Sequence, residues 1–226
     1  EDYLQMVSAE QKEYAEVSAH QRIAENNDII TDFQTDNLME KILHKDNLNK
    51  AYKKVKSNKG AGGVDGMSVD ELLGFLKDNQ KQLIQKIKDG KYKPNPVRRV
   101  EIPKETKGEF RKLGVPTVVD RVFQQAITQV LSPIYEKQFS ENSFGFRPNR
   151  GAHDALKQCQ TNVNDGYVYV VDMDLEKFFD TVCQSKLIEV LSRTIKDGRV
   201  ISLIHKYLNA GVISRGMFEK TEVGMP

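Results

Sequence analysis

Residues 167–180 read YVYVVDMDLEKFFD, a β-branched, apolar run that ends in two aspartates and leads into two phenylalanines. This composition predicts a buried strand over residues 167–174. Side chains alternate along a strand, so Asp172 and Asp174 share one face, about 7 Å apart. Two interpretations follow. Asp174 caps a following helix, or the carboxylates hold a hard cation such as Mg²⁺, and local spacing leaves both open.

Length and composition are those of a globular protein. The 226 residues are 38% hydrophobic and 29% charged, which predicts one large or two small domains. No apolar run reaches the ~18 residues of a membrane span, so we expect no membrane partner. The acidic N-terminus lacks the basic region of a secretory signal. Cys159 and Cys183 lack metal-ligand spacing and indicate free thiols in a reducing cytoplasm rather than a disulfide.

Charge is distributed unevenly along the chain. Residues 1–42 hold three bases and ten acids (3 − 10 = −7), whereas residues 81–112 hold eleven bases and four acids (11 − 4 = +7). A solvated face explains many such runs. Clustered Lys and Arg also bind polyanions by releasing counterions, so the basic block is a candidate phosphate-binding surface.

The remaining patterns predict mixed helices and strands. Helical periodicity covers residues 3–24, 38–55, 118–139, 152–163, 184–195 and 198–209, with Asp36 as one N-cap and a Ser68–Glu71 capping box before another helix. Residues 97–104 and 109–116 read as a β-hairpin, and residues 211–226 as another. This mixed order predicts an α+β fold rather than a parallel doubly wound sheet.

Five blocks occur in a characteristic order: NKGAGGVDG, RKLGVPTVVDRVFQQAI, SFGFRPNRGAHDAL, VVDMDLEKFFDTV and VGMP. From residue 36 to 226 the chain resembles bacterial group II intron-encoded reverse transcriptases (maturases). The resemblance implies right-hand polymerase fingers with the first part of the palm. It divides the chain into an N-terminal helical extension (1–35), fingers with an N-terminal lid block (36–165) and a partial palm (166–226).

The resemblance also assigns the nucleotide site. Asp174 becomes the catalytic aspartate and, with the main-chain carbonyl of Leu175, a ligand to Mg²⁺, with Mn²⁺ as an alternative. Phe179 becomes the gate whose ring would clash with a 2′-OH, which selects dNTP over ribonucleotides. Asp172 does not match the catalytic position. Asp180 is interpreted as structural.

Basic residues of the fingers are assigned to the triphosphate and the template. Lys104 and Arg111 match the triphosphate-binding positions, with Lys107 as an alternative to Lys104 because six residues separate Lys104 from Arg111. The template and RNA-binding candidates are Lys59, Gly60, Gly62, Gly63, Arg98, Arg99, Arg121 and Arg147. Each assignment has a structural alternative. The hairpin charges could lie on a solvated turn, the glycine-rich block could be an ordinary loop, and Arg121 could form a buried ion pair with Asp120.

The resemblance implies RNA-directed DNA synthesis by two-metal nucleotidyl transfer and binding of intron RNA to assist splicing and mobility. Its partners would be group II intron RNA, an RNA template with a DNA primer, and target DNA, in a bacterial cytoplasm. A homodimer, through the N-terminal helix or through the exposed face of the palm, is a further expectation. No Tyr-x-Asp-Asp motif occurs in the sequence, so we expect this chain alone not to extend a primer. The alternatives are a non-catalytic intron-RNA-binding module and a reverse transcriptase of a retron, diversity-generating or defence system.

Overall fold

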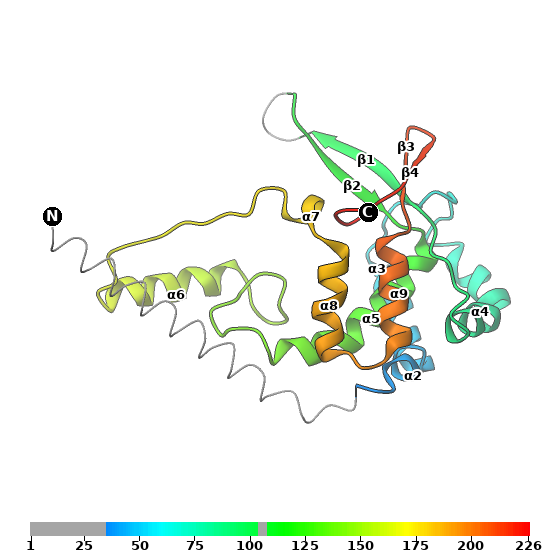
Figure 1. Ribbon diagram of the computed structural model, residues 1–226, viewed down its shortest axis with the longest axis horizontal. Coiled ribbons are helices and arrows are strands. Elements are labelled where there is room, and N and C mark those ends of the chain that lie inside the picture. Colours follow the sequence, from blue (N-terminus) through cyan, green and yellow to red (C-terminus); the bar gives the residue numbers. More distant parts are fainter. Residues whose placement is uncertain (1–34, 104–107) are drawn as a thin grey trace. The chain divides into compact units, whose positions relative to one another are not determined.

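The computed structural model describes residues 35–103 and 108–226 (Figure 1). The helix predicted over residues 3–24 and the tip of the first hairpin lie outside the described residues. The chain divides into two compact units. We call residues 35–133 with 166–226 the larger unit, and residues 134–165 the smaller unit.

The larger unit contains five of the predicted helical segments and both predicted hairpins. Its helices are α2 (Leu38–Ile42), α3 (Lys45–Ser57), α4 (Leu72–Lys88), α5 (Val118–Glu136, which runs on into the smaller unit), α7 (Phe178–Thr181), α8 (Gln184–Thr194) and α9 (Gly198–Leu208). The helix predicted over residues 38–55 is therefore two helices, because the chain turns at Leu43 and His44. The N-cap of α2 is Asn37 rather than Asp36. The Ser68–Glu71 capping box is confirmed, since each residue's backbone N–H donates to the other's side chain.

Four strands, labelled in Figure 1, form one mixed sheet in the order β2-β1-β3-β4. Strands β1 (Val97–Pro103) and β2 (Phe110–Val115) pair antiparallel, which confirms the predicted hairpin. Strands β3 (Val212–Ser214) and β4 (Met217–Glu219) form the second hairpin, and β3 pairs with β1 in parallel. The sheet therefore joins the hairpin that carries Arg111 to the C-terminal part of the chain.

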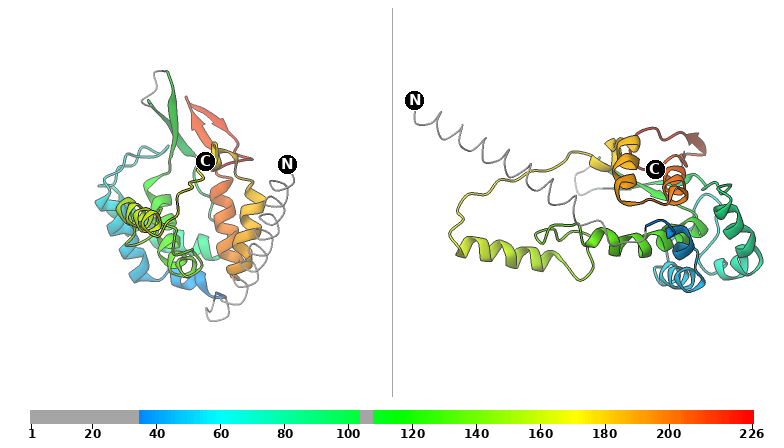
Figure 2. Two further views of the ribbon diagram at one scale, coloured as in Figure 1. Left: turned by 90° about the vertical axis from the view of Figure 1, so that its left-hand side faces the viewer. Right: turned by 60° about the horizontal axis from the view of Figure 1, so that its bottom comes forward.

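The core of the larger unit gathers around the apolar face of α5. Val119, Val122, Phe123 and Ile127 are buried as their helical spacing predicts, whereas Val130 and Leu131 are half-buried. Helices α8 and α9 pack side by side, as Figures 1 and 2 both show. No helix within the described ranges is long and apolar enough to cross a bilayer.

A buried carboxylate joins α9 to α2. Asp197 is the N-cap of α9 and accepts the Arg199 N–H at 3.1 Å and the Met39 N–H at 2.9 Å. The Arg199 guanidinium bonds both Asp197 and Glu40. Burial raises the pKa of Asp197, but the hydrogen bonds from Arg199 and Met39 outweigh it, so the pKa is lowered. This contact holds the first described helix against the C-terminal pair.

The smaller unit contains α6 (Ala152–Asn164) and the loop that precedes it. It begins one residue after Pro133, which lies inside α5 and cannot donate a backbone hydrogen bond. Cys159 in α6 and Cys183 before α8 are both free and exposed, which agrees with the prediction of free thiols.

Candidate active site and nucleic-acid interface

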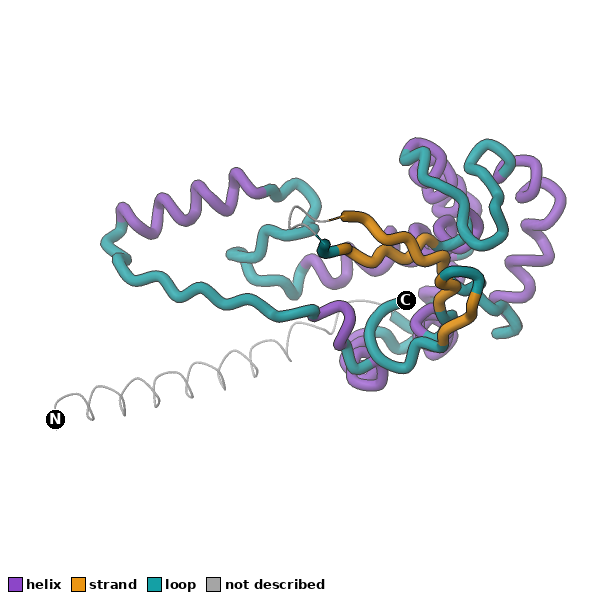
Figure 3. The backbone as a smooth tube through the Cα atoms, turned by 90° about the horizontal axis from the view of Figure 1, so that it is seen from above, coloured by secondary structure: helices purple, strands orange, loops and turns teal. Residues whose placement is uncertain are grey.

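The stretch that carries Asp174 is not a strand, which corrects the sequence prediction. Residues 167–175 are extended but have no ladder partner among the described strands, and Figure 3 draws them as loop. Tyr169 is 94% and Val170 is 84% exposed. The β-branched composition satisfies only the local requirement of a strand. The hydrogen bonds that hold a strand come from neighbours elsewhere in the chain.

The predicted metal ligands lie on this exposed stretch. Asp172 and Asp174 face solvent, and Leu175 is 70% exposed, so its carbonyl belongs to the same open segment. The described residues contain no group of three or more His, Cys, Asp or Glu side chains placed to hold a metal. The donors present are one carboxylate at the motif position and a neighbouring carbonyl, which are oxygen ligands of the kind that Mg²⁺ takes.

Phe179 lies in α7, directly after this stretch. Its ring is 62% exposed and meets Phe178 edge-on, with 5.5 Å between the ring centroids. Lys177 precedes the helix with φ of 48°, a left-handed turn that ends the extended stretch. A hydrogen bond restrains the backbone of Phe179, because its carbonyl accepts the Met225 N–H at 2.9 Å. Phe179 thus presents an aromatic face from a fixed backbone.

The hairpin presents only one of its two predicted triphosphate ligands within the described residues. Arg111 lies on β2, exposed, opposite Ile102 of β1. Lys104 and its alternative Lys107 lie outside the described residues. The charge of Arg111 stands on a paired strand, whereas the loop that joins the two strands carries the lysines.

Two of the predicted template arginines hold the glycine-rich loop, residues 59–66. The Arg98 guanidinium donates two hydrogen bonds to the Gly62 carbonyl, at 2.9 and 3.1 Å. Arg121 donates to the Ala61 carbonyl at 2.5 Å. Burial lowers the pKa of Arg121, against the effect of Asp65. Both arginines therefore use some of their N–H donors to bind the loop.

Close approach of the backbone requires glycine at one position of this loop. A Cβ on Gly63 would lie 2.6 Å from the Thr117 backbone, whereas a Cβ on Gly60 would meet only the mobile end of the Arg121 side chain. Lys59 enters the loop with φ of 46°. Arg99 is half-buried on β1, in register with Gly114. The structure therefore brings Arg98, Arg121 and the loop together, at one end of the hairpin.

Asp120 and Arg121 do not pair with each other, which corrects the alternative drawn from the sequence. Asp120 is fully buried and accepts from the Tyr92 hydroxyl at 2.7 Å, the Thr117 hydroxyl at 2.7 Å and the Asn95 N–H at 3.2 Å. Burial is the main cause that raises the pKa of Tyr92, and the negative charge of Asp120 raises it further. This network fixes the start of α5 and the chain that enters β1.

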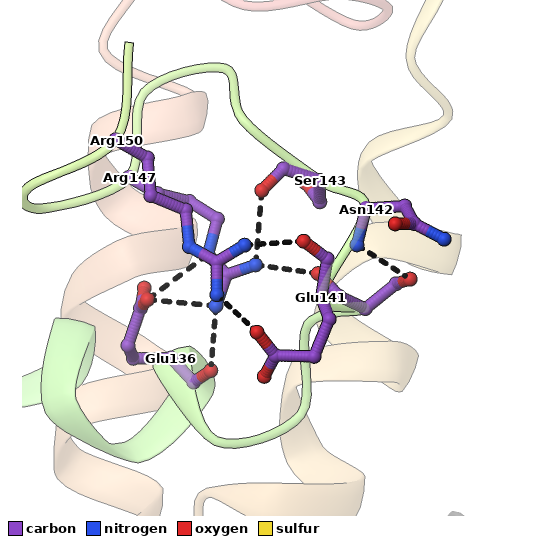
Figure 4. Close-up of polar contacts among 7 residues, drawn as sticks. Glu136, Glu141, Asn142, Ser143, Arg147 and Arg150 are labelled. Atoms are coloured by element: carbon purple, nitrogen blue, oxygen red, sulfur yellow. Dashed lines mark hydrogen bonds and ion pairs between the residues drawn. The ribbon is translucent and has the colours of Figure 1, made fainter. Parts of the chain in front are cut away.

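Arg147 is the most enclosed of the predicted template arginines, and Figure 4 shows its partners in the smaller unit. Its side chain is 4% exposed and pairs with Glu136 at 2.7 Å. It also donates to the carbonyls of Ser140 at 2.5 Å and Ser143 at 3.0 Å. Arg150 pairs with Glu141 beside it. In this arrangement Arg147 shapes the loop of residues 136–147, and its contact with template remains a prediction.

Comparison with known proteins now decides the family. The family model described as reverse transcriptase (RNA-dependent DNA polymerase) matches residues 102–226. The chain belongs to the reverse transcriptase family. It is 36% identical over 206 residues to the group II intron-encoded protein LtrA of Lactococcus lactis subsp. cremoris. The aligned region covers 91% of this chain and 34% of LtrA. It is 37% identical over 176 residues to protein YkfC of Escherichia coli K12, covering 75% of this chain and 46% of YkfC.

The α+β fold of the chain is confirmed by solved structures. A chain of a partial Cas6-RT-Cas1–Cas2 complex superposes with a TM-score of 0.54 at 20% identity, over 84% of this chain and 31% of that one. At this identity the likeness shows the fold alone. The predicted resemblance to group II intron-encoded proteins is confirmed by the relatives. This chain spans about a third of the length of LtrA, 34%.

Sequence reasoning missed three residues that hold the elements around the candidate site. Tyr92 and Thr117 hold Asp120, and Gln184 is a buried amide that binds carbonyls of distant segments. Thr117 lies three residues before Asp120, the spacing of a capping box, which was a usable signal. Nothing local marks Gln184, because its partners lie 24 and 40 residues away.

Proposed function

We propose that this chain is the fingers and the first part of the palm of an RNA-directed DNA polymerase encoded by a group II intron. The observation that carries the proposal is the combination of the family match over residues 102–226 with an exposed Asp174 and Phe179 and a loop pinned by two arginines. The division into extension (1–35), fingers (36–165) and partial palm (166–226) is part of the proposal.

A divalent metal, Mg²⁺ with Mn²⁺ as an alternative, would be held by the Asp174 carboxylate and the Leu175 carbonyl. Bound there, it would stabilise the charge on the transferring phosphate, and phosphate oxygens and water would complete its shell. Exposure of both donors supports this assignment. The chain's own contribution is to hold two oxygen ligands next to each other, immediately before the gate residue Phe179.

The incoming dNTP would lie with its sugar edge on the Phe179 ring and its triphosphate toward the hairpin. Arg111 and Lys104 would neutralise the charge that develops on the leaving pyrophosphate. Lys59, the glycine loop and the arginines at its base, with Arg99 and Arg147, would contact the template. The same basic surface would bind group II intron RNA during splicing, and the whole protein would engage target DNA, in the bacterial cytoplasm.

The polymerase part of the proposal is tested with RNA-templated primer extension by the whole protein. Arg111→Gln removes the charge proposed for the triphosphate, so KM for dNTP should rise about tenfold or more. Lys112→Gln is the matched control, because residues 111 and 112 point to opposite faces of β2. Equal KM values for the two variants would contradict the assignment of Arg111.

The RNA part is tested on the 226-residue chain. Its affinity for a group II intron RNA should fall at least about tenfold between about 50 and 200 mM salt, because phosphate contacts release counterions. Lys59→Gln should lower the affinity and the salt slope, whereas Lys41→Gln in α2 should change neither. Salt-insensitive binding would contradict the proposal. Salt-sensitive RNA binding in a whole protein that extends no primer would instead indicate the non-catalytic RNA-binding module.

A further inference from the structure

The last segment of the chain, residues 221–226, lies against the backbone of α7, and we call it the strap. The Met225 N–H donates to the Phe179 carbonyl at 2.9 Å, and the Gly224 N–H donates to the Val182 carbonyl at 2.8 Å. Gly224 has φ of 77°, and a Cβ there would lie 2.5 Å from the Asp180 carbonyl oxygen. Only glycine permits this approach, so the strap follows α7 at backbone contact distance.

A buried side-chain amide also holds the strap in this position. Gln184, the first residue of α8, is 6% exposed. Its Nε2 donates to the Gly224 carbonyl at 2.9 Å and to the Leu208 carbonyl at 3.0 Å, with the Thr221 carbonyl farther away at 3.4 Å. Both amide hydrogens are therefore used, one on the strap and one on the end of α9.

The end of the strap meets the fingers hairpin. A Cβ on Gly114 would lie 2.8 Å from the Pro226 carbonyl oxygen, so β2 and the strap are in contact at a position without a side chain. Gly114 follows Arg111 by three residues on the same strand. Figure 1 shows the C-terminus beside β2. The strap thus touches both the helix of the gate and the strand of the proposed triphosphate ligand.

Little else determines where Phe179 lies. Helix α7 has four residues, too few to be stable alone, and the stretch before it has no strand partner in the described chain. The Phe179 ring packs on Phe178, which is itself half-exposed. The hydrogen bonds from the strap are therefore the main restraints on the gate within the described residues.

We propose that Gln184 is a positioning residue for Phe179, which acts through the strap and so sets the discrimination between dNTP and ribonucleotides. The inference rests on the proposed role of Phe179 as the sugar gate. A gate discriminates by a clash of a few tenths of an ångström, so its backbone must be held firmly. Gln184 supplies that restraint without touching the substrate.

The test compares two replacements of similar length. Gln184→Met keeps the volume and removes both donors, whereas Gln184→His keeps one ring N–H at a similar reach. In the 226-residue chain, Gln184→Met should speed hydrogen exchange at the Gly224 and Met225 amides about tenfold, which corresponds to about 1.4 kcal/mol. Gln184→His should restore part of the protection. Gln158→Met on exposed α6 is the control and should change neither amide.

The functional readout is the ratio of kcat/KM for dNTP to that for the matching ribonucleotide, measured in the whole polymerase. Gln184→Met should lower this ratio about tenfold, with kcat for dNTP retained within about threefold. Met225→Pro removes the amide donor to Phe179 and places a ring carbon against that carbonyl, so it should lower the ratio in the same way. It keeps the test valid if Gln184→Met does not fold.

Two results would overturn the proposal, and they are distinguishable. If Phe179→Ala lowers the ratio but Gln184→Met and Met225→Pro do not, Gln184 does not position the gate. If Phe179→Ala leaves the ratio unchanged while the Gly224 and Met225 amides still respond to Gln184→Met, the gate assignment itself fails and the inference fails with it.

Discussion

Two aspartates of this chain lie in opposite surroundings. Asp120, at the start of α5, is fully buried and has each carboxylate oxygen occupied by hydroxyl or backbone donors. Asp174 lies in an exposed, unpaired stretch. A carboxylate whose oxygens are already used can stabilise the fold but is not available to a metal. A carboxylate without such donors contributes little to stability and remains available for a ligand. The hydrogen-bond partners of an aspartate therefore decide whether it can serve the fold or a ligand.

The largest effect on stability is expected at Asp120, the carboxylate that is buried and fully hydrogen-bonded. Asp120→Asn replaces an acceptor by an amide donor facing the hydroxyls of Tyr92 and Thr117, so the free energy of unfolding should fall by about 2–4 kcal/mol. Urea denaturation of the 226-residue chain measures it. The same change in the open stretch, Asp172→Asn, should alter it by less than about 0.5 kcal/mol. Equal losses would remove the contrast between the two regions.

A second, smaller effect is expected from the buried arginine of the smaller unit. Arg147→Met leaves the Glu136 carboxylate and the Ser140 and Ser143 carbonyls without this donor, at a cost of about 2 kcal/mol. Proteolysis between residues 137 and 151 should become faster. Arg150→Met, which removes the neighbouring pair with exposed Glu141, should change the rate less. The reverse ranking would indicate that Arg147 is held for template rather than for the loop.

The smallest effect is a pH dependence that arises at Asp197. Its pKa is lowered in the folded chain, so the stability it contributes is present above the ordinary aspartate range and is lost as the pH falls through the lowered pKa. Asp197→Asn should therefore cost about 1 kcal/mol near pH 7 and progressively less below about pH 4. Urea denaturation from pH 7 to pH 2 measures the difference. A difference that stays constant to pH 2 would contradict the role of the Arg199 and Met39 hydrogen bonds.

The same contrast explains which parts were predictable from the sequence. The α5 face and the first hairpin depend on local periodicity and turn residues, and both were predicted correctly. Residues 167–174 have the composition of a strand, but a strand needs partners that no local pattern specifies, so that prediction was wrong. The ordered motifs assigned Asp174 and Phe179 to the site, and that assignment stays a prediction. They could not reveal that Arg98 and Arg121 bind the glycine loop, because those contacts span 36 and 60 residues.

The most direct test of the central claim is RNA-templated primer extension by the whole protein carrying Asp174→Asn, with Asp172→Asn as its neighbour control. If Asp174 is the open carboxylate that binds the metal, Asp174→Asn should lower the extension rate on the order of 10²–10³-fold with an unchanged melting temperature. Asp172→Asn should retain activity. Extension by Asp174→Asn at the rate of the unmodified protein would contradict the account.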